Sequence, residues 1–118
     1  MSTAPISSTP TNRRREMHDV EAPAMFQFTT RQPTLGGTLI DISIVTVKGK
    51  ETTQYMIEDE EGHRFTFLAT WDLLRKIRPA HVGHFMWISY EGEDSSVETQ
   101  GSPLKKFRVQ VSREKEPL

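Results

Sequence analysis

The segment from Thr66 to Gly92, TFLATWDLLRKIRPAHVGHFMWISYEG, constrains the fold most, because two different periodicities meet in it. Thr70 is suited to cap a helix that begins at Trp71. Pro79 lacks an amide proton and disfavours helical angles before it, so this helix can run for only about two turns. After Gly83 the apolar residues alternate instead, as they do in a strand. A helix this short cannot build a bundle, so strands must supply the rest of the fold.

Both elements of this segment have a predicted buried face. The helix is expected to bury Leu73, Leu74 and Ile77 and to expose its basic side chains. The strand carries large apolar groups on both faces, one of which must meet the core. We expect the core face to be Met86, Ile88 and Tyr90, and the opposite face to be Phe85, Trp87 and Ser89.

The composition allows one domain and excludes several classes of protein. The chain has 118 residues, of which 35% are hydrophobic, so part of it is expected outside the core. It contains no cysteine, which excludes a disulfide framework, a thiolate metal site and a cysteine nucleophile. It has neither a run of about 20 apolar residues nor an apolar signal region. We therefore expect no membrane partner, and a cytoplasmic location in a bacterium or an infected host cell.

The two ends of the chain lack a periodic apolar pattern. Residues 1–24 are rich in Ser, Thr and Pro and are predicted to form a flexible tail. In this tail, Arg13, Arg14 and Arg15 precede three acidic residues, and could contact a phosphate or an acidic partner, or be a solvated charge cluster. Residues 114–118 are predicted to fray, which leaves a domain over residues 25–113.

Alternating apolar residues predict the strands of this domain. The strand expected at 37–48 changes its apolar parity at Ile44–Val45, which indicates a β-bulge. The acidic segment 91–103 is predicted to be a loop. The order is β-β-β-α-β-β, an all-β fold with one short helix. The other strands are expected at 52–59, 63–68, 85–90 and 104–112, with a short edge strand at 25–30 that places Phe26 and Phe28 on one face.

This order is that of the OB-fold, a five-stranded Greek-key barrel whose strand 2–3 face and flanking loops bind single strands. Over residues 37–112 the chain resembles the phage and prophage OB-fold proteins of the single-stranded-DNA-binding type. The resemblance rests on the hairpin YMIEDEEGHRFTF, the turn ATWDLL, and VGHFMWISYEG followed by GSPLKKFRVQV. It implies binding of single-stranded DNA, rather than RNA, in DNA replication. The C-terminal EKEPL lacks the acidic, Phe-ended tip of well-known bacterial single-strand-binding proteins, so recruitment of repair enzymes is not implied.

Neither a catalytic constellation nor a cofactor site is evident in the sequence. The acidic residues fall in predicted hairpin tips and loops, and nothing pairs a nucleophile with a positioned base. His81 and His84, with His63, could be imagined as a zinc site, but their spacing does not place them on one helix face. We therefore expect a non-enzyme whose histidines lie on the surface.

Aromatic and basic side chains supply what single-strand binding requires, which is π-faces for bases and cations for phosphates. Phe85, Trp87 and Trp71 are the aromatic candidates. Each could instead be structural, because Phe85 and Trp87 could cover the second face of the sheet beneath residues 25–28, and Trp71 could close the barrel. The basic candidates, which could converge on one groove, are Lys48, Lys50, Arg64, Lys105, Lys106 and Arg108.

Charge weighs against a simple nucleic-acid coat, because the formal net charge is −1 and acidic residues crowd segments 58–61 and 91–98. Two functions therefore remain open. One is sequence-tolerant binding of single-stranded nucleic acid. The other is a protein-interaction OB module, an accessory subunit of a viral or bacterial replication, transcription or virion assembly. Its exposed Phe85–Trp87 face would meet a protein partner or a second copy.

Overall fold

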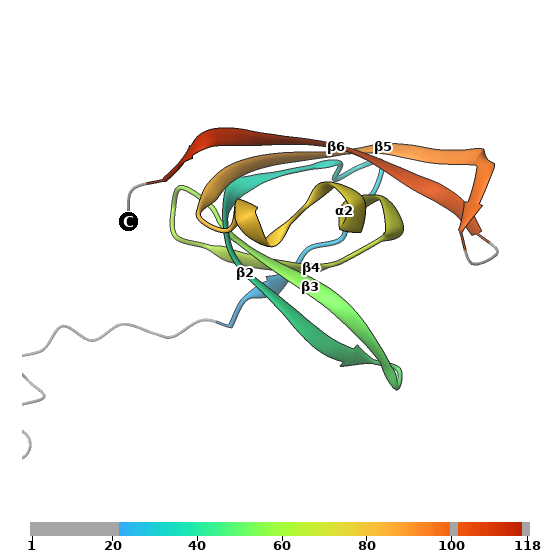
Figure 1. Cartoon of the computed structure of the whole chain (residues 1–118), viewed down its shortest axis with the longest axis horizontal. Helices are drawn as coiled ribbons and strands as arrows, with labels where there is room; N and C mark the ends of the chain where they lie inside the picture. The colour runs from blue at the N-terminus through green and yellow to red at the C-terminus, as the bar shows by residue number, and fades with distance from the viewer. Residues whose placement is uncertain (1–21, 100–101, 117–118) are drawn as a thin grey trace, which may run out of the picture.

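Six strands of one curled sheet form most of the protein (Figure 1). The computed structural model describes residues 22–99 and 102–116. The strands are hydrogen-bonded in the order β1-β4-β3-β2-β5-β6, and every pair is antiparallel except β1 with β4. The elements are β1 (Ala24–Met25), β2 (Thr34–Val47), β3 (Lys50–Glu58), β4 (Arg64–Leu68), α2 (Trp71–Lys76), the 3₁₀ turn η2 (Pro79–His81), β5 (His84–Thr99) and β6 (Ser102–Lys115).

The long strand β2 joins the two halves of the sheet. Residues 34–38 pair with β5 and residues 38–47 pair with β3, so the sheet curls around this strand. Gly37 permits the close approach of β2 to β3, because a Cβ atom at Gly37 would lie 2.4 Å from Cγ2 of Ile57 on β3. The bulge predicted at Ile44–Val45 is wrong in position, since the register shifts between Leu39 and Asp41. Ile44 is 61% exposed on the projecting β2–β3 hairpin. The change of apolar parity there does not move a side chain out of the core, so it does not require a bulge.

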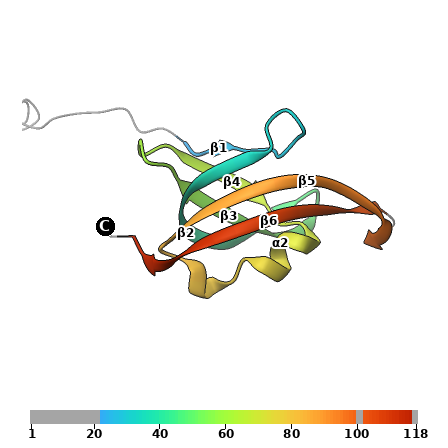
Figure 2. The same cartoon turned by 90° about the horizontal axis from the view of Figure 1, so that it is seen from above.

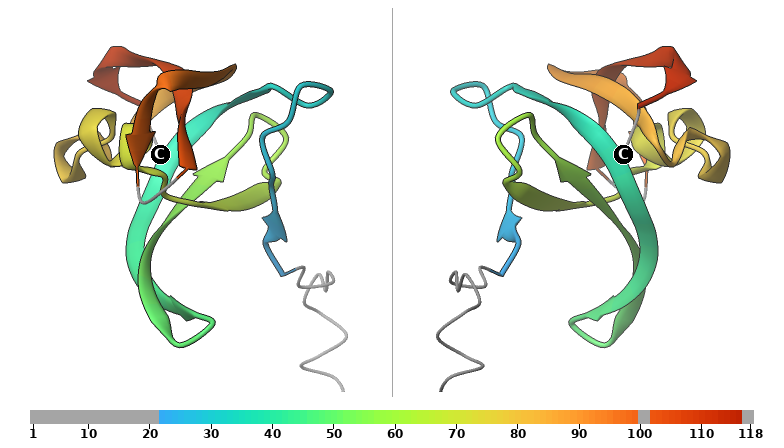
Figure 3. Two further views of the ribbon diagram at one scale, coloured as in Figure 1. Left: turned by 90° about the vertical axis from the view of Figure 1, so that its right-hand side faces the viewer. Right: turned by 90° about the vertical axis from the view of Figure 1, so that its left-hand side faces the viewer.

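The predicted all-β fold with one short helix is confirmed, but the sheet is not the closed five-stranded barrel that was expected. Within the described residues no ladder joins β4 to β6. The edge of β4 instead pairs with β1, and Phe26 N–H donates to Thr66 C=O at 2.7 Å (Figure 3). Phe28 bridges β4 and β6, because its ring centre lies 5.4 Å from that of Phe67 on β4 and 5.2 Å from that of Phe107 on β6. Aromatic side chains therefore close the gap where a backbone ladder is absent.

The core lies inside the curl and confirms most of the predicted faces. Met86 and Ile88 are fully buried, and Tyr90 packs against them at the margin. In α2, Leu73 is buried as predicted, but Leu74 is 52% exposed and that prediction is wrong. Leu74 directly follows Leu73, so the two side chains point about 100° apart around a helix of 3.6 residues per turn and only one can meet the core. The other fully buried apolar side chains are Leu39, Tyr55, Ile57 and Phe67.

Two hairpin arms, β2–β3 and β5–β6, extend beyond the core (Figure 1). Of the segment 91–103, predicted to be a loop, residues 91–99 and 102–103 instead continue the β5–β6 ladder, and residues 114–115 extend β6 where fraying was expected. The register of this ladder shifts at Tyr90/Gly92 and at Asp94/Glu98. The ladder can be polar because a solvated hairpin needs no apolar face. Most of the predicted tail, residues 1–21, and part of the predicted C-terminal segment lie outside the described residues. No helix among the described residues is long and apolar enough to cross a membrane.

Two truncations should separate the N-terminal residues that matter for stability from those that do not. A chain starting at Met25 is expected to melt within a few degrees of the full chain, because it keeps Phe26 and Phe28 on the core. A chain starting at Thr30 loses both rings. Its melting temperature should fall by about 8 °C or more, corresponding to at least about 2 kcal/mol. Calorimetry on both chains measures this, and equal melting temperatures would show that the two rings contribute nothing.

Candidate nucleic-acid interface

A groove of about 510 Å³ lies where the beginnings of β3, α2 and β6 meet. Lys50 and Glu51 border it from β3, Trp71 and Leu74 from α2, and Lys105 from β6. The two hairpin arms project on the same side of the molecule (Figure 1). Three segments that are far apart in sequence therefore place one large aromatic ring and two lysines around one depression.

Trp71 is held at the first position of α2 with its ring at the surface. Thr70 caps the helix as predicted, since its Oγ1 accepts from Leu73 N–H at 3.4 Å. The Trp71 side chain remains 48% exposed, and the Arg75 guanidinium carbon lies 4.5 Å from the centre of its ring. A cation at this distance over a Trp ring is attracted to its π-face. Arg75 therefore supports the ring of Trp71, about half of which stays exposed.

Asp72 connects this helix to β6. Its fully buried carboxylate accepts from Arg75 at 2.7 Å, from Lys76 at 2.9 Å and from Phe107 N–H at 2.8 Å. Lys76 also donates to the Phe107 carbonyl. These side chains thus bond the main-chain edge of β6 at Phe107. A signal was present in the sequence, because Asp72 precedes Arg75 and Lys76 by three and four residues, a spacing that forms ion pairs on a helix.

These contacts determine the direction in which the pKa of Asp72 is shifted. Burial by itself would raise the pKa of the carboxyl. The hydrogen bonds from Arg75 and Lys76, together with the Phe107 amide, outweigh burial and hold the pKa below its ordinary value. Asp72 is therefore ionised at neutral pH, and it fixes the guanidinium of Arg75 against Trp71.

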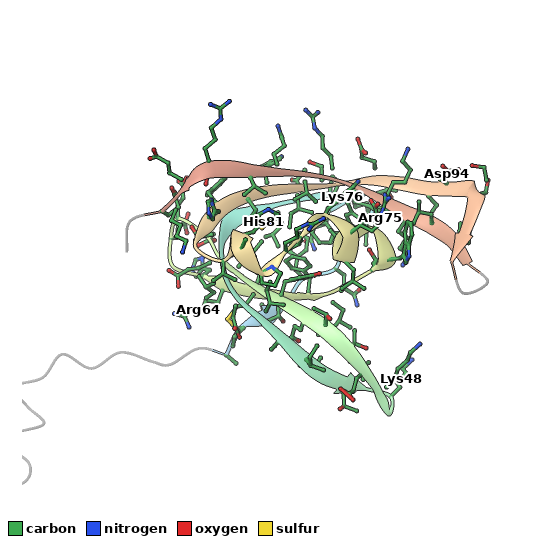
Figure 4. The ribbon with its side chains drawn as sticks, viewed as in Figure 1. Lys48, Arg64, Arg75, Lys76, His81 and Asp94 are labelled. Carbon is green, nitrogen blue, oxygen red and sulfur yellow. The ribbon has the colours of Figure 1, made fainter. Side chains whose placement is uncertain are left out.

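The nine predicted site residues do not converge on one groove. Lys50, Trp71 and Lys105 line the groove, and Lys48 lies at the nearby tip of the β2–β3 hairpin. Arg64 lies at the other side of the molecule from Lys48, where its Nε is 3.0 Å from the Glu58 carboxylate (Figure 4). The remaining four, on β5 and β6 and outside the groove lining, are Phe85, Trp87, Lys106 and Arg108.

Trp87 lies on the outer face of the sheet, opposite the buried Met86 and Ile88, as its parity predicted. Its ring covers Gly36 of the adjacent strand, where a Cβ atom would come within 2.4 Å of a ring carbon. The side chain is still 44% exposed. Packing on Gly36 supports the structural interpretation of Trp87, while its exposure leaves part of the ring accessible.

Acidic and histidine side chains occupy other parts of the surface. Asp94 lies on the β5 arm and accepts from both the hydroxyl and the N–H of Ser96, which holds the pKa of its carboxyl below the ordinary value (Figure 4). This charge would repel a phosphate chain that passed over the tip of the arm. His81 and His84 lie with their ring centres 6.5 Å apart. In the described residues no three His, Asp or Glu side chains are grouped so as to hold a metal ion.

Comparison of the chain with known protein families, curated proteins and solved structures finds no match.

Proposed function

We propose that the protein binds single-stranded nucleic acid in the groove between β3, α2 and β6. The observation that carries this proposal is Trp71, a half-exposed ring supported on one face by Arg75 and flanked by Lys50 and Lys105. Proteins that bind single strands without sequence preference combine aromatic platforms with a basic track. This groove brings both features together.

The connectivity supports the same proposal. Strands β2, β3 and β4, then α2, then β5 and β6 follow the chain order of an OB-fold, and β2 pairs with both β3 and β5. We interpret the sheet as an open variant of that fold, in which β1 and the side chains of α2 occupy the edges that would otherwise meet. The groove then lies beside the strand face and loops that OB-folds use for oligonucleotides. The resemblance to phage-type proteins favours DNA over RNA and a cytoplasmic role in replication.

Trp71→Ala should weaken binding of a labelled oligothymidylate by about 1–3 kcal/mol, which is the contribution of one base stacked on an aromatic side chain. The slope of log K against log salt should stay unchanged, because stacking is not ionic. Trp87→Ala is the matched control, since both tryptophans are about half exposed but only Trp71 borders the groove. Fluorescence anisotropy measures both. A loss with Trp87→Ala and none with Trp71→Ala would move the site to the outer face of the sheet.

The two groove lysines should act through phosphates instead. Changing Lys50 and Lys105 together to Ala is expected to flatten the salt dependence by about 1.4, because each phosphate contact on a single strand contributes about 0.7. The double change of Lys106 and Arg108 to Ala removes the same charge outside the groove and should leave the slope as it was. Equal slopes in the parent and the Lys50/Lys105 variant would place the phosphate path elsewhere.

The second candidate is a protein-interaction module, and the exposure of Leu74 favours it. This side chain borders the groove beside Trp71, so part of the rim is apolar. Exposed apolar and aromatic groups that lie side by side are typical of sites where a protein partner binds. Absence of oligonucleotide binding by the folded protein at low salt would favour this candidate. Tighter binding of an RNA oligonucleotide than of DNA would instead keep the groove and change its ligand.

A further inference from the structure

A second cavity, of about 400 Å³, lies along the seam between β4 and β6, and we call it the seam cavity. Its lining includes Phe28, Phe67 and Lys105. β1 and α2 lie at opposite sides of the molecule with β4 between them, so the seam leads from one to the other (Figure 2). Among the described residues, the main-chain hydrogen bonds from the N-terminal segment to β4 end at Phe26 N–H. Beyond that bond, side chains form the wall of the cavity.

The wall of the seam cavity is mainly aromatic and apolar. Phe67 and Phe107 contribute to it but are buried in the core. Phe28 packs against them and is only partly buried, so its ring is the one of the three that a ligand can reach. A cavity of this size, with an apolar wall and a few polar groups, is typical of ligand sites in proteins. The accessible ring makes the seam cavity suitable for a flat group.

The seam cavity adjoins the groove that contains Trp71. Three residues, Ala69, Thr70 and Lys105, line both of them. Trp71 borders the groove and not the seam cavity, whereas Phe28 borders the seam cavity and not the groove. Each of the two hollows therefore contributes one accessible aromatic ring, and the lysine on β6 belongs to both. A ligand long enough to enter both hollows would pass Lys105 on the way.

The polar groups of the seam cavity suit an anionic ligand. Lys105 is exposed, and it is the one charged side chain among the described residues of the lining. Its cross-strand partner on β5, Glu93, is not part of that lining. Thr70 Oγ1 accepts from Leu73 N–H and can still donate its own hydrogen. A phosphate beside Lys105 would therefore meet a cation and a hydroxyl donor, and no carboxylate from the cavity wall.

We propose that the seam cavity is a second base-binding site, which takes another base of the single strand that stacks on Trp71 while Lys105 contacts the phosphate backbone between the two bases. This inference rests on the proposed function, because it adds a site to the same bound strand. Proteins that bind single strands hold successive bases on separate aromatic side chains, each of which adds to the affinity. The ligand is then a strand of several nucleotides whose two bound bases are parted from each other, rather than a mononucleotide.

Phe28→Leu tests the second site, because it keeps an apolar side chain on the core and removes the aromatic face. It should weaken binding of a labelled oligothymidylate about fivefold or more and leave the salt slope unchanged. Phe65→Leu is the matched control, since Phe65 is also partly buried but lines neither hollow. The control should bind within about twofold of the parent. Fluorescence anisotropy measures the affinities, and circular dichroism checks that both variants fold.

Photocrosslinking locates the bound bases on the full chain without a substitution. The probe is an oligonucleotide in which every thymine is replaced by 5-iodouracil, a base that couples on irradiation to an aromatic side chain beside it. Mass spectrometry of the digested protein should find the nucleotide on both Trp71 and Phe28. This measurement decides the question even if Phe28→Leu does not fold.

The outcomes separate the second site from the proposed function. Weaker binding by Phe28→Leu and not by Phe65→Leu, with crosslinks at both Trp71 and Phe28, would support the second site. Weaker binding by Trp71→Ala alone, with crosslinks at Trp71 only, would overturn the second site and keep the groove. A parent that binds no oligonucleotide at low salt would overturn the proposed function and the second site with it. A dimer that Phe28→Leu dissociates would make the seam cavity an interface between copies and overturn the inference.

Discussion

Ile88→Ala is expected to lower the free energy of unfolding by about 2–5 kcal/mol, which is the usual cost of a large-to-small change in a core. Ile88 is fully buried and lies on the central strand β5, where it pairs with Leu35 of β2 and Val109 of β6. Three strands surround the cavity that Ala would leave, so the site cannot collapse easily. Denaturation in urea, with the m-value checked for constancy, measures the loss.

Ile44→Ala is the matched control for Ile88, since it removes the same atoms from a side chain that is 61% exposed. It should change the free energy of unfolding by less than about 0.5 kcal/mol. Ile42 is only partly buried, so the cost of Ile42→Ala should fall between the two. A loss below about 1 kcal/mol at Ile88 would mean that β5 does not present this face to the core.

Asp72→Ala should destabilise the protein by about 1–3 kcal/mol at neutral pH, because it leaves the buried Phe107 N–H without an acceptor. Arg75 and Lys76 lose their partner as well, but both are partly exposed and stay hydrated, so their contribution is smaller. Asp72→Asn keeps an oxygen that can accept from Phe107 and should cost less. Equal losses for the two substitutions would mean that the charge, rather than the main-chain contact, carries the stabilisation.

The stabilisation by Asp72 should also depend on acid. Its folded pKa lies below the ordinary value, so the stabilisation by its charge is fully present above the unfolded pKa of about 3.9. It is lost as the pH falls through the lower folded pKa. The difference in stability between the parent and Asp72→Asn should therefore shrink below about pH 4. Unfolding curves between pH 7 and pH 2.5 measure this, and a constant difference would show that the carboxyl is not ionised in the folded protein.

The groove was predictable only in part. Lys50, Trp71 and Lys105 were recognised as binding candidates from residue type and predicted position, but so were Arg64 and Trp87, which lie elsewhere. Parity along a strand separates its two faces, and it placed Trp87 on the outer face correctly. It does not say which segments of other strands border that face. The bond that joins α2 to β6 runs from Phe107 N–H to Asp72, two residues 35 positions apart in the chain.

The sequence by itself determined the local structure, because the physical causes of that structure lie within a few residues. Thr70 and Pro79 bound the helix, and alternation assigns Met86 and Ile88 to the core. Only the tertiary structure decided that the sheet stays open and that β6 keeps a free edge. At Phe107 the main-chain N–H is bonded by the buried carboxylate of Asp72 rather than by another strand. That contact joins groups far apart in the chain, so no local pattern of residues records it.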